Sequence, residues 1–393
     1  MTRKKELRIG VIGAGGRGAL AGNAHRPKDG VRLVAGADTD PKALAKFRET
    51  YGPDVLVTSD YREVLARKDI GAVFVTTPDF LHEEHAVAAL KAGKAVYLEK
   101  PMAITIEGCD RILRTAFQTK CKLYVGHNMR HFSVIEKMKE VIDQGAIGEV
   151  KTAWCRHFVS YGGDAYFKDW HADRSKSAGL LLQKAAHDID VLHWLCGSYT
   201  RTVTAMGDLM VYGKIKDRHA RSARGDASFT PANWPPLSQK QLNPVINVED
   251  VSMMLMRLQS GVLASYEQCH FTPDSWRNYT VIGTEGRLEN FNDSGDCIVR
   301  VWSTRRDAYR LEGDTEYVLH REPGGHGGSD AKIVDEFVRF VRRGGRTNTS
   351  PVAARYAVAA GVMATESLRH GSNAREVPRL PPKLTSYYEA GQI

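Results

Sequence analysis

A glycine-rich turn near the start of the chain constrains its fold more than any other feature of the sequence. Residues 7–12 form a short apolar run that ends directly in the pattern G-x-G-x-x-G at residues 13–18. A second apolar run, residues 31–37, ends at Asp38, 20 positions after the last glycine. This order of elements predicts a β-α-β unit that binds a dinucleotide. It consists of a strand, a glycine turn, a helical stretch and a second strand that ends in an acidic residue.

The residues of this motif have separate predicted tasks. Gly13 permits the tight turn, Gly15 lets a pyrophosphate approach the backbone, and Gly18 lets the helix and strand pack closely. The free N–H groups at the helix start attract the phosphates. Asp38 accepts hydrogen bonds from the adenosine ribose hydroxyls, and its charge disfavours a 2′-phosphate at that position. The sequence therefore predicts NAD rather than NADP as the cofactor.

Strands and helices continue to alternate through the first third of the chain. The spacing of apolar residues predicts helices at residues 61–66, 83–92 and 107–119 and strands at residues 72–76, 95–98 and 122–125. Repeated βα units form a parallel sheet, and the ligands of such a sheet bind beyond the carboxyl ends of its strands. Four segments that follow strands are therefore expected to meet in one crevice, namely residues 13–18, 76–78, 99–101 and 126–128.

Lys100 occupies an unusual position among these segments. It follows a predicted strand and precedes Pro101, whose fixed φ angle and missing N–H make the turn stiff. Lysine at the surface is usually just solvated. At the predicted crevice, however, an ammonium group would lie beside the nicotinamide, where it can polarise a substrate hydroxyl or carbonyl.

The motifs together resemble those of the Gfo/Idh/MocA oxidoreductase family. The matching segments are residues 13–18, 77–78 with His82, 99–101, 126–130 and 181–190. The resemblance implies a Rossmann domain, residues 1–128, followed by an α/β domain, residues 129–393, with a large, open, mostly antiparallel sheet that often mediates dimers or tetramers. It also implies reversible NAD(P)-linked oxidation of a sugar or cyclitol hydroxyl. The expected cofactor contacts are Gly13, Gly15, Gly16, Arg17, Gly18, Asp38, Thr76, Thr77, Pro78, His82, Glu99 and Asn128.

The predicted helix in the second domain departs from the family pattern. Many relatives carry D-x-G-x-H there, whereas this chain reads Q-K-A-A-H from Gln183 to His187. Residues four apart share a helix face, so both side chains are expected to meet the substrate. An amide hydrogen-bonds a hydroxyl but carries no proton at pH 7. Acid–base work therefore falls on His187, with Lys100 orienting the reacting oxygen. Lys184 points elsewhere on an ideal helix, and it is either a substrate contact or structural.

Other polar residues are candidate substrate contacts, although each also suits a plain surface position. Trp170 offers a flat face to a sugar ring, and His171 and Arg174 suit hydroxyls or an anionic substituent. Arg130, just after the fourth crevice segment, is a similar candidate. His326 stands among four glycines, which bring a backbone close to another group.

The rest of the chain fits the second domain. Glycine turns and alternating residues predict an antiparallel sheet with strands at residues 201–212, 250–270, 278–291, 301–302 and 317–320. Helices are expected at residues 331–343 and 353–369, and a proline-rich tail at residues 377–384. The long aperiodic stretch of residues 213–247 is expected to cover a partner subunit or to rim the substrate cleft.

Composition excludes several other classes. The 6 cysteines lie far apart in the sequence, which argues against a disulfide framework and against a structural zinc site. We therefore expect no metal. The formal charge is +9, but the densest basic cluster, residues 3–5, is too short for a nucleic-acid arm. No apolar run approaches the roughly 18 residues of a membrane span. The basic, then apolar, start reads as a first strand rather than a secretion signal. We therefore expect a cytoplasmic protein, and the family resemblance implies a homo-oligomer with a small carbohydrate substrate.

Three functional hypotheses remain. The first is an NAD-dependent dehydrogenase that acts on a ring hydroxyl, at C3 in a pyranose. The second is a glycosidase that retains NAD while it oxidises a ring hydroxyl, eliminates the aglycone, adds water and returns the hydride. The basic residues expected at its site would allow an anionic sugar as its substrate. The third is an inactive regulator that senses the dinucleotide, against which Lys100 and His187 argue. Net NADH formation separates the first hypothesis from the second.

Overall fold

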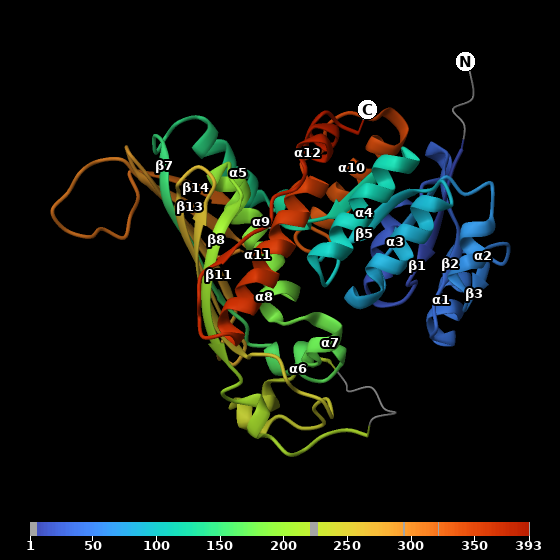
Figure 1. Ribbon diagram of the computed structural model, residues 1–393, viewed down its shortest axis with the longest axis horizontal. Coiled ribbons are helices and arrows are strands. Elements are labelled where there is room, and N and C mark those ends of the chain that lie inside the picture. The colour runs from blue at the N-terminus through green and yellow to red at the C-terminus, as the bar shows by residue number, and fades with distance from the viewer. Residues whose placement is uncertain (1–5, 221–226, 294, 321, 393) are drawn as a thin grey trace. The chain divides into compact units, whose positions relative to one another are not determined.

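The computed structural model describes residues 6–220, 227–293, 295–320 and 322–392 (Figure 1). The basic cluster at residues 3–5 lies outside these ranges. The chain divides into two compact units. The first unit comprises Met1–His131, Gly324–Arg355 and Arg379–Ile393, and the second comprises Phe132–Pro323 and Tyr356–Pro378. The segment expected to form the second domain is thus distributed over both units.

The first unit is built on a six-stranded parallel sheet with the strand order β3-β2-β1-β4-β5-β6. Its strands are β1 (Leu7–Ile12), β2 (Val31–Ala37), β3 (Leu56–Thr58), β4 (Ala72–Val75), β5 (Ala95–Glu99) and β6 (Leu123–Gly126). The strand order reverses between β1 and β4. The expected parallel sheet is therefore confirmed. In a doubly wound sheet, ligands bind outside the carboxyl ends of the strands at this reversal.

Helices pack around this sheet. They are α1 (Pro41–Tyr51), α2 (Tyr61–Ala66), α3 (His82–Lys91), α4 (Ile106–Thr119), α10 (Ser329–Arg343) and α12 (Pro382–Glu389). The helical stretch expected after the glycine turn is a 3₁₀ helix, η1 (Gly16–Ala24). The proline-rich tail leads into α12, and the Tyr388 hydroxyl there donates a 2.6 Å hydrogen bond to the Leu113 carbonyl of α4.

A late helix completes the core of the first unit. Phe337 of α10 packs edge-on against Phe74 of β4 and Tyr97 of β5, with ring centroids 5.2 and 5.6 Å away. All three side chains are fully buried. Aromatic pairs at this separation are favourable beyond their buried area. This packing explains why α10 belongs with the N-terminal sheet although it lies more than 200 residues later in the sequence than β6.

The second unit contains a nine-stranded sheet in the order β14-β13-β12-β11-β7-β10-β9-β8-β15. Its strands are β7 (Val150–Phe158), β8 (Thr200–Asp208), β9 (Val251–Leu258), β10 (Leu263–Cys269), β11 (Trp276–Gly283), β12 (Arg287–Phe291), β13 (Cys297–Trp302), β14 (Thr315–Leu319) and β15 (Arg375–Glu376). β7 and β10 run parallel, and the other described pairs are antiparallel. The expected mostly antiparallel sheet is confirmed, with the unexpected β7 near its centre.

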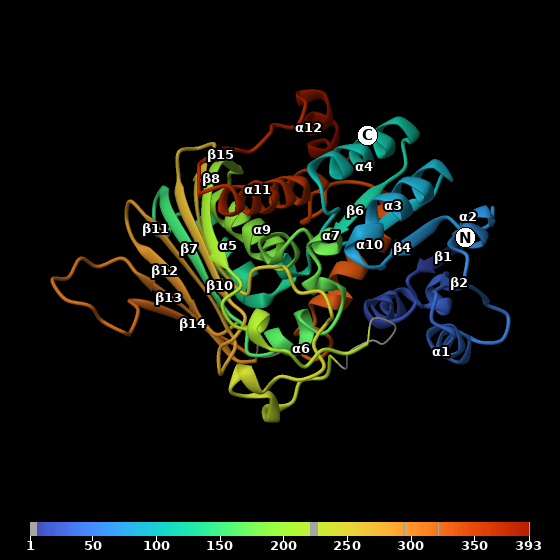
Figure 2. The same cartoon turned by 60° about the horizontal axis from the view of Figure 1, so that its bottom comes forward.

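Helices α5 (Ser133–Asp143) and α9 (Ala185–Cys196) lie on one face of this sheet in both views (Figures 1 and 2). The short helices α6 (Gly162–Tyr166), α7 (Arg174–Ser177) and α8 (Leu180–Gln183) precede α9, and α11 (Pro351–Arg369) starts in the first unit and continues into the second. The single helix expected at residues 181–190 is therefore split at Lys184. Residues 213–247 contain only short 3₁₀ turns where they are described. Within the described ranges, no helix is long and apolar enough to cross a membrane.

Candidate functional site

The glycine turn after β1 is seated against the segment after β4. Gly13 has a φ angle of +89°, and a Cβ atom there would lie 2.8 Å from the Thr76 carbonyl carbon. A Cβ atom on Gly18 would lie 2.1 Å from the Gly13 carbonyl oxygen. The Thr76 hydroxyl donates a 2.8 Å hydrogen bond to that same oxygen. Both positions therefore require glycine, because a side chain would force the turn open.

Asp38 is held beside this turn at the end of β2. Its Oδ2 accepts a 2.8 Å hydrogen bond from the Gly15 N–H, and its Oδ1 accepts a 2.9 Å bond from the Asp40 N–H. The carboxylate is thus fixed in orientation next to the glycine turn, as recognition of the adenosine ribose requires. Its negative charge opposes a 2′-phosphate. The turn and the acid of this chain therefore fit NAD.

Arg17 links the turn to two carboxylates. Its Nε donates to Glu99 Oε2 at 3.2 Å, and its Nη1 donates to both oxygens of Asp330 at 3.0 Å. Burial lowers the pKa of the Arg17 guanidinium, but Glu99 and Asp330 more than offset burial, and the pKa lies above its ordinary value. Asp330 also lies 2.9 Å from His326 Nδ1. Sequence reasoning missed Asp330, although it directly follows the glycine-rich segment that contains His326.

His82 connects the segments that follow β4 and β5. Its ring is fully buried, with Nε2 2.7 Å from the Thr77 carbonyl oxygen and Nδ1 2.7 Å from the Pro101 carbonyl oxygen. The peptide bond between Lys100 and Pro101 is cis. His82 therefore fixes the backbone next to Lys100 at the end of β5, within the same unit as the glycine turn and Asp38.

Three further predicted residues lie in the first unit. Asn128 is buried and donates to Asp330 Oδ1 at 3.4 Å. Arg130 is also buried, and its Nη1 donates a 2.7 Å bond to the Asn348 carbonyl. His326 remains about half exposed while it contacts Asp330. Arg130 and His326, which we expected to contact substrate, thus belong to the unit that carries the predicted cofactor residues.

The other predicted substrate residues lie in the second unit around the break between α8 and α9. Gln183 ends α8 and is buried, whereas His187 lies in the first turn of α9. The helical assignment is interrupted between them at Lys184, whose backbone angles remain in the right-handed helical region. Lys184 at the break is 6% exposed, and its Nζ donates a 3.1 Å hydrogen bond to the Tyr161 hydroxyl. Tyr161 was missed by the sequence reasoning.

Aromatic rings continue from this lysine into the preceding loop. Lys184 Nζ lies 5.3 Å from the ring centroid of Tyr166, which meets the His171 ring edge-on at 5.4 Å. His171 stacks on Trp170 at 3.7 Å, and its Nδ1 lies 2.5 Å from Asp169 Oδ1. The structure therefore brings Trp170, His171 and Lys184 together as one group, through Tyr166.

Arg174 is engaged differently. Its Nε and Nη2 donate to the Asn247 carbonyl at 3.1 and 2.7 Å. The Arg174 N–H also donates to the Asn247 side chain at 2.7 Å. The guanidinium thus ties α7 to the end of the long loop at residues 213–247, a structural contact that the sequence pattern did not indicate.

Asp188, next to His187, anchors α9 to the sheet. Its Oδ1 accepts from the Tyr279 hydroxyl at 2.5 Å and pairs with Arg277 Nε at 3.0 Å. Its Oδ2 accepts from the Tyr266 hydroxyl at 3.0 Å and lies 3.0 Å from His157 Nδ1. Burial raises the pKa of Asp188, but Arg277, His157 and the hydrogen bonds lower it by more than burial raises it. The pKa therefore lies below its ordinary value, and the carboxyl stays ionised. Strands β7, β10 and β11 thereby hold the start of α9.

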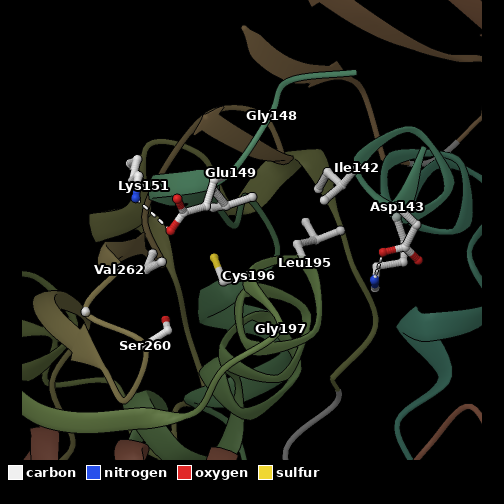
Figure 3. Close-up of a pocket in the computed structure, with 13 residues that line it drawn as sticks. Ile142, Asp143, Gly148, Glu149, Lys151, Leu195, Cys196, Gly197, Ser260 and Val262 are labelled. Atoms are coloured by element: carbon white, nitrogen blue, oxygen red, sulfur yellow. Dashed lines mark hydrogen bonds and ion pairs between the residues drawn. The ribbon is translucent and has the colours of Figure 1, made fainter. Parts of the chain in front are cut away.

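A separate cleft of about 430 Å³ lies at the other end of α9 (Figure 3). It is lined by the ends of α5 and α9, the start of β7 and the turn at residues 260–262. Cys196 and Leu195 lie in it together with the Glu149–Lys151 ion pair. Cys196 is nine residues beyond His187, or about 14 Å along a helix. None of the predicted site residues lines this cleft.

The sequence predicted no metal site, and the described residues bear on that expectation. In the described ranges, no group of three or more His, Cys, Asp or Glu side chains could hold a metal ion. The described polar groups instead gather around the glycine turn in the first unit and around Lys184 and Asp188 in the second.

Comparisons with known proteins agree with this organisation. The model of the oxidoreductase family with an NAD-binding Rossmann fold matches residues 7–127, and that of its C-terminal alpha/beta domain matches residues 139–376. Inositol 2-dehydrogenase of Burkholderia lata is 34% identical over 56% of this chain and 61% of its own length. The 2,7-anhydro-N-acetylneuraminate hydratase of Mediterraneibacter gnavus is 31% identical over 52% of this chain and 53% of its own length.

The chain thus spans about half to three fifths of these two relatives. Among solved structures, levoglucosan dehydrogenase in complex with NADH and L-sorbose superposes with a TM-score of 0.77. That match covers 96% of this chain and 100% of the other, at 20% identity. At this identity the similarity establishes the fold alone.

Proposed function

Because the chain belongs to the Gfo/Idh/MocA family of NAD-binding oxidoreductases, we propose that it oxidises and reduces a secondary ring hydroxyl of a pyranose, a glycoside or a cyclitol, at C3 in a pyranose. The observation that carries the proposal is the position of Lys100. It directly follows β5, in the unit whose glycine turn and Asp38 fit NAD, and His82 fixes the backbone beside it. The similarity to inositol 2-dehydrogenase of Burkholderia lata supports the same substrate class.

The proposed roles involve residues of both units, and the first unit includes residues from the segment predicted to form the second domain. Bound NAD supplies the hydride acceptor. The cofactor is held by the predicted cofactor contacts, which include the glycine turn, Asp38, residues 76–78, Glu99 and Asn128. Lys100 orients the reacting oxygen and lowers the pKa of the substrate hydroxyl, and His187 exchanges its proton. The remaining hydroxyls or an anionic substituent are bound by the predicted substrate contacts, namely Gln183, Lys184, Trp170, His171, Arg174, Arg130 and His326.

A second candidate is an NAD-dependent glycoside hydrolase. In that reaction, transient oxidation of a ring hydroxyl acidifies the neighbouring C–H, the aglycone leaves by elimination, water adds, and the hydride returns. Gln183 favours this candidate, because an amide replaces the carboxylate common at this position in the family. The hydratase among the relatives, which is named for an anionic sugar, also supports it.

Simultaneous assays distinguish the two candidates. Purified protein is mixed with NAD and a panel of free sugars, cyclitols and aryl glycosides, some of them anionic, while NADH absorbance and aglycone release are followed together. Stoichiometric NADH that Lys100→Ala abolishes supports the dehydrogenase. Aglycone release that requires NAD but yields no net NADH supports the hydrolase. Lys151→Ala, which removes an exposed lysine from the remote cleft, is the matched control and should leave either signal unchanged.

We also propose that the protein is a cytoplasmic homo-oligomer associating through its large sheet. Met206, Met253 and Leu255 on β8 and β9 are 68, 56 and 62% exposed, and Met206 and Met253 are directly paired across the strands. Exposed apolar groups that cluster on one face mark interaction surfaces. Light scattering after gel filtration should report a dimer or tetramer that Leu255→Glu dissociates, and a monomeric wild type would contradict this part of the proposal.

A further inference from the structure

Lys184 is a buried cation that has no acidic partner among the described residues. Its side chain is 6% exposed, and within the described part of the chain it forms no ion pair with a carboxylate. Its ammonium instead donates to the Tyr161 hydroxyl at 3.1 Å. It also lies 5.3 Å from the ring centroids of both Tyr161 and Tyr166. Removing an ammonium from water is costly unless it is paired, so this arrangement favours an ionised phenol as the counter-charge.

The groups around the pair act in the same direction. The Lys184 ammonium lowers the pKa of Tyr161, burial raises it, and Arg277 lowers it further, while Asp293 acts against them. The net effect is a pKa below that of an ordinary tyrosine. Burial lowers the pKa of Lys184, but Tyr166 and Tyr161 more than offset burial. Each partner therefore stabilises the charged form of the other.

The neighbouring groups do not compete for this role. Burial raises the pKa of Tyr166, so this second phenol stays protonated. His270 meets the Tyr166 ring edge-on at 5.4 Å, and burial together with His157 and Lys184 holds its pKa well below its ordinary value. Burial and Arg277 likewise lower the pKa of His157. Tyr161 is thus the group near Lys184 whose ionisation the surroundings promote.

The position of Tyr161 suits contact with a substrate. It lies between β7 and α6 and is only partly buried, whereas Lys184, which donates to its hydroxyl, is buried at the break before α9. Lys184 adjoins Gln183, the position where many family members carry a carboxylate, and precedes His187 by three residues. The pair therefore stands among the proposed substrate residues, at the position where the amide of Gln183 replaces the carboxylate common in the family.

We propose that Tyr161 is a catalytic acid–base residue for the substrate hydroxyl and that Lys184 is its positioning residue. The inference rests on the proposed oxidoreductase function. In oxidation, the Tyr161 phenolate takes the hydroxyl proton, the oxygen's electron pair forms the carbonyl, and the C–H electron pair leaves as hydride to the nicotinamide. In reduction, the Tyr161 hydroxyl returns the proton to the oxygen that accepts hydride at its carbon. In this refinement, Tyr161 takes over the proton exchange that the proposed function assigns to His187, and His187 binds the substrate.

The first test is a spectroscopic titration of the protein without cofactor. Tyrosinate absorbance near 295 nm is followed with pH in the wild type and in Tyr161→Phe, and the difference isolates one of the 15 tyrosines. That difference should show a tyrosine that ionises at lower pH than an ordinary one. Lys184→Met should move its ionisation to higher pH, and Lys184→Arg should restore it in part. Tyr309→Phe, at an exposed position, is the control. An unchanged early transition in Tyr161→Phe would overturn the inference.

The second test is the pH dependence of turnover on the substrate found with the panel above. The oxidation rate should rise with pH as Tyr161 ionises, and Lys184→Met should shift that rise to higher pH. Tyr161→Phe should lower kcat about 10²–10⁴-fold, the usual effect of losing an acid–base group, and remove the rise. If Tyr161→Phe keeps the wild-type kcat and profile, the inference is wrong. A wild type that turns over nothing in the panel contradicts the proposed function instead, and the titration still decides whether the Tyr161–Lys184 pair is ionised.

Discussion

Oδ1 of Asp188 lies 3.0 Å from Nε of Arg277, and both side chains are buried between α9 and the central strands of the large sheet. Arg277 also reaches Asp293 through Nη1 at 3.1 Å. A buried ion pair of this kind adds little net stability over apolar residues, but loss of one partner leaves an uncompensated charge. The pair therefore fixes where α9 begins, and with it the positions of Lys184 and His187.

Asp188→Asn should destabilise the protein strongly. The amide cannot neutralise Arg277, so the free energy of unfolding should fall by about 3–5 kcal/mol. Denaturant unfolding followed by far-ultraviolet circular dichroism measures this change. Glu149→Gln removes an exposed partner of Lys151 and serves as the control, with an expected loss below about 1 kcal/mol. Equal effects of the two substitutions would mean that the buried pair does not anchor α9.

Local features of the sequence were sufficient to predict the first sheet and its turn. The glycine spacing, Asp38 and the βα alternation each depend on neighbouring residues, and the structure has the corresponding elements in parallel order. Asp330 was not predicted as the partner of Arg17, because the two are 313 positions apart and no local pattern reports such a contact. The packing of α10 on the first sheet was missed for the same reason.

The second unit was harder to predict at its centre. The β7 strand alternates buried and partly exposed side chains, but its buried positions include Cys155 and His157, so its hydrophobic pattern is weak. Without β7, nothing in the sequence brings Tyr161 toward Lys184. The sequence pattern also contained no sign that Lys184 is buried at the junction of α8 and α9 and contacts Tyr161. Tertiary packing decided both features.

Asp38→Asn should weaken the preference for NAD over NADP. The amide keeps the shape of the side chain but removes the charge that opposes a 2′-phosphate. The ratio of the two dissociation constants should shift toward NADP about 10-fold or more, which corresponds to roughly 1.4 kcal/mol. Fluorescence titration with the reduced cofactors measures both constants. Asp54→Asn, an exposed position in the same unit, should leave the ratio as it is in the wild type. A ratio that Asp38→Asn does not alter would remove Asp38 from ribose recognition.

Gly18→Ala should impair cofactor binding. The new Cβ atom would lie 2.1 Å from the Gly13 carbonyl oxygen, so the glycine turn must move. We expect the dissociation constant for NAD to rise at least about 10-fold, or roughly 1.4 kcal/mol, measured by calorimetric titration. Gly93→Ala is the matched control, because Gly93 has a φ angle of +76° and open space around its Cβ position. It should cost about 1 kcal/mol of stability and leave NAD affinity unchanged. Equal NAD affinity in Gly18→Ala and the wild type would contradict close packing at the turn.

His157 makes stability depend on pH. Burial, followed by Arg277, lowers the pKa of His157 to about 3 in the folded protein, whereas an unfolded histidine titrates near pH 6.5. A depressed folded pKa means that the unfolded chain binds the extra proton first. The stability that the neutral ring contributes is therefore complete above about pH 6.5 and is lost as the pH falls toward 3, by roughly 1.4 kcal/mol per pH unit. His157→Gln should remove this part of the slope.

The measurement is the free energy of unfolding from denaturant titrations between pH 7.5 and 4.5, and the quantity of interest is the difference in slope between the wild type and His157→Gln. Differences are needed because burial also lowers the pKa of His25, His85 and His270, which add to the wild-type slope. His370→Gln, at an exposed position, is the control and should keep the wild-type slope. Parallel slopes for the wild type and His157→Gln would show that His157 binds its proton equally in the folded and the unfolded protein. The statement that the His157 ring is neutral beside Asp188 would then be wrong.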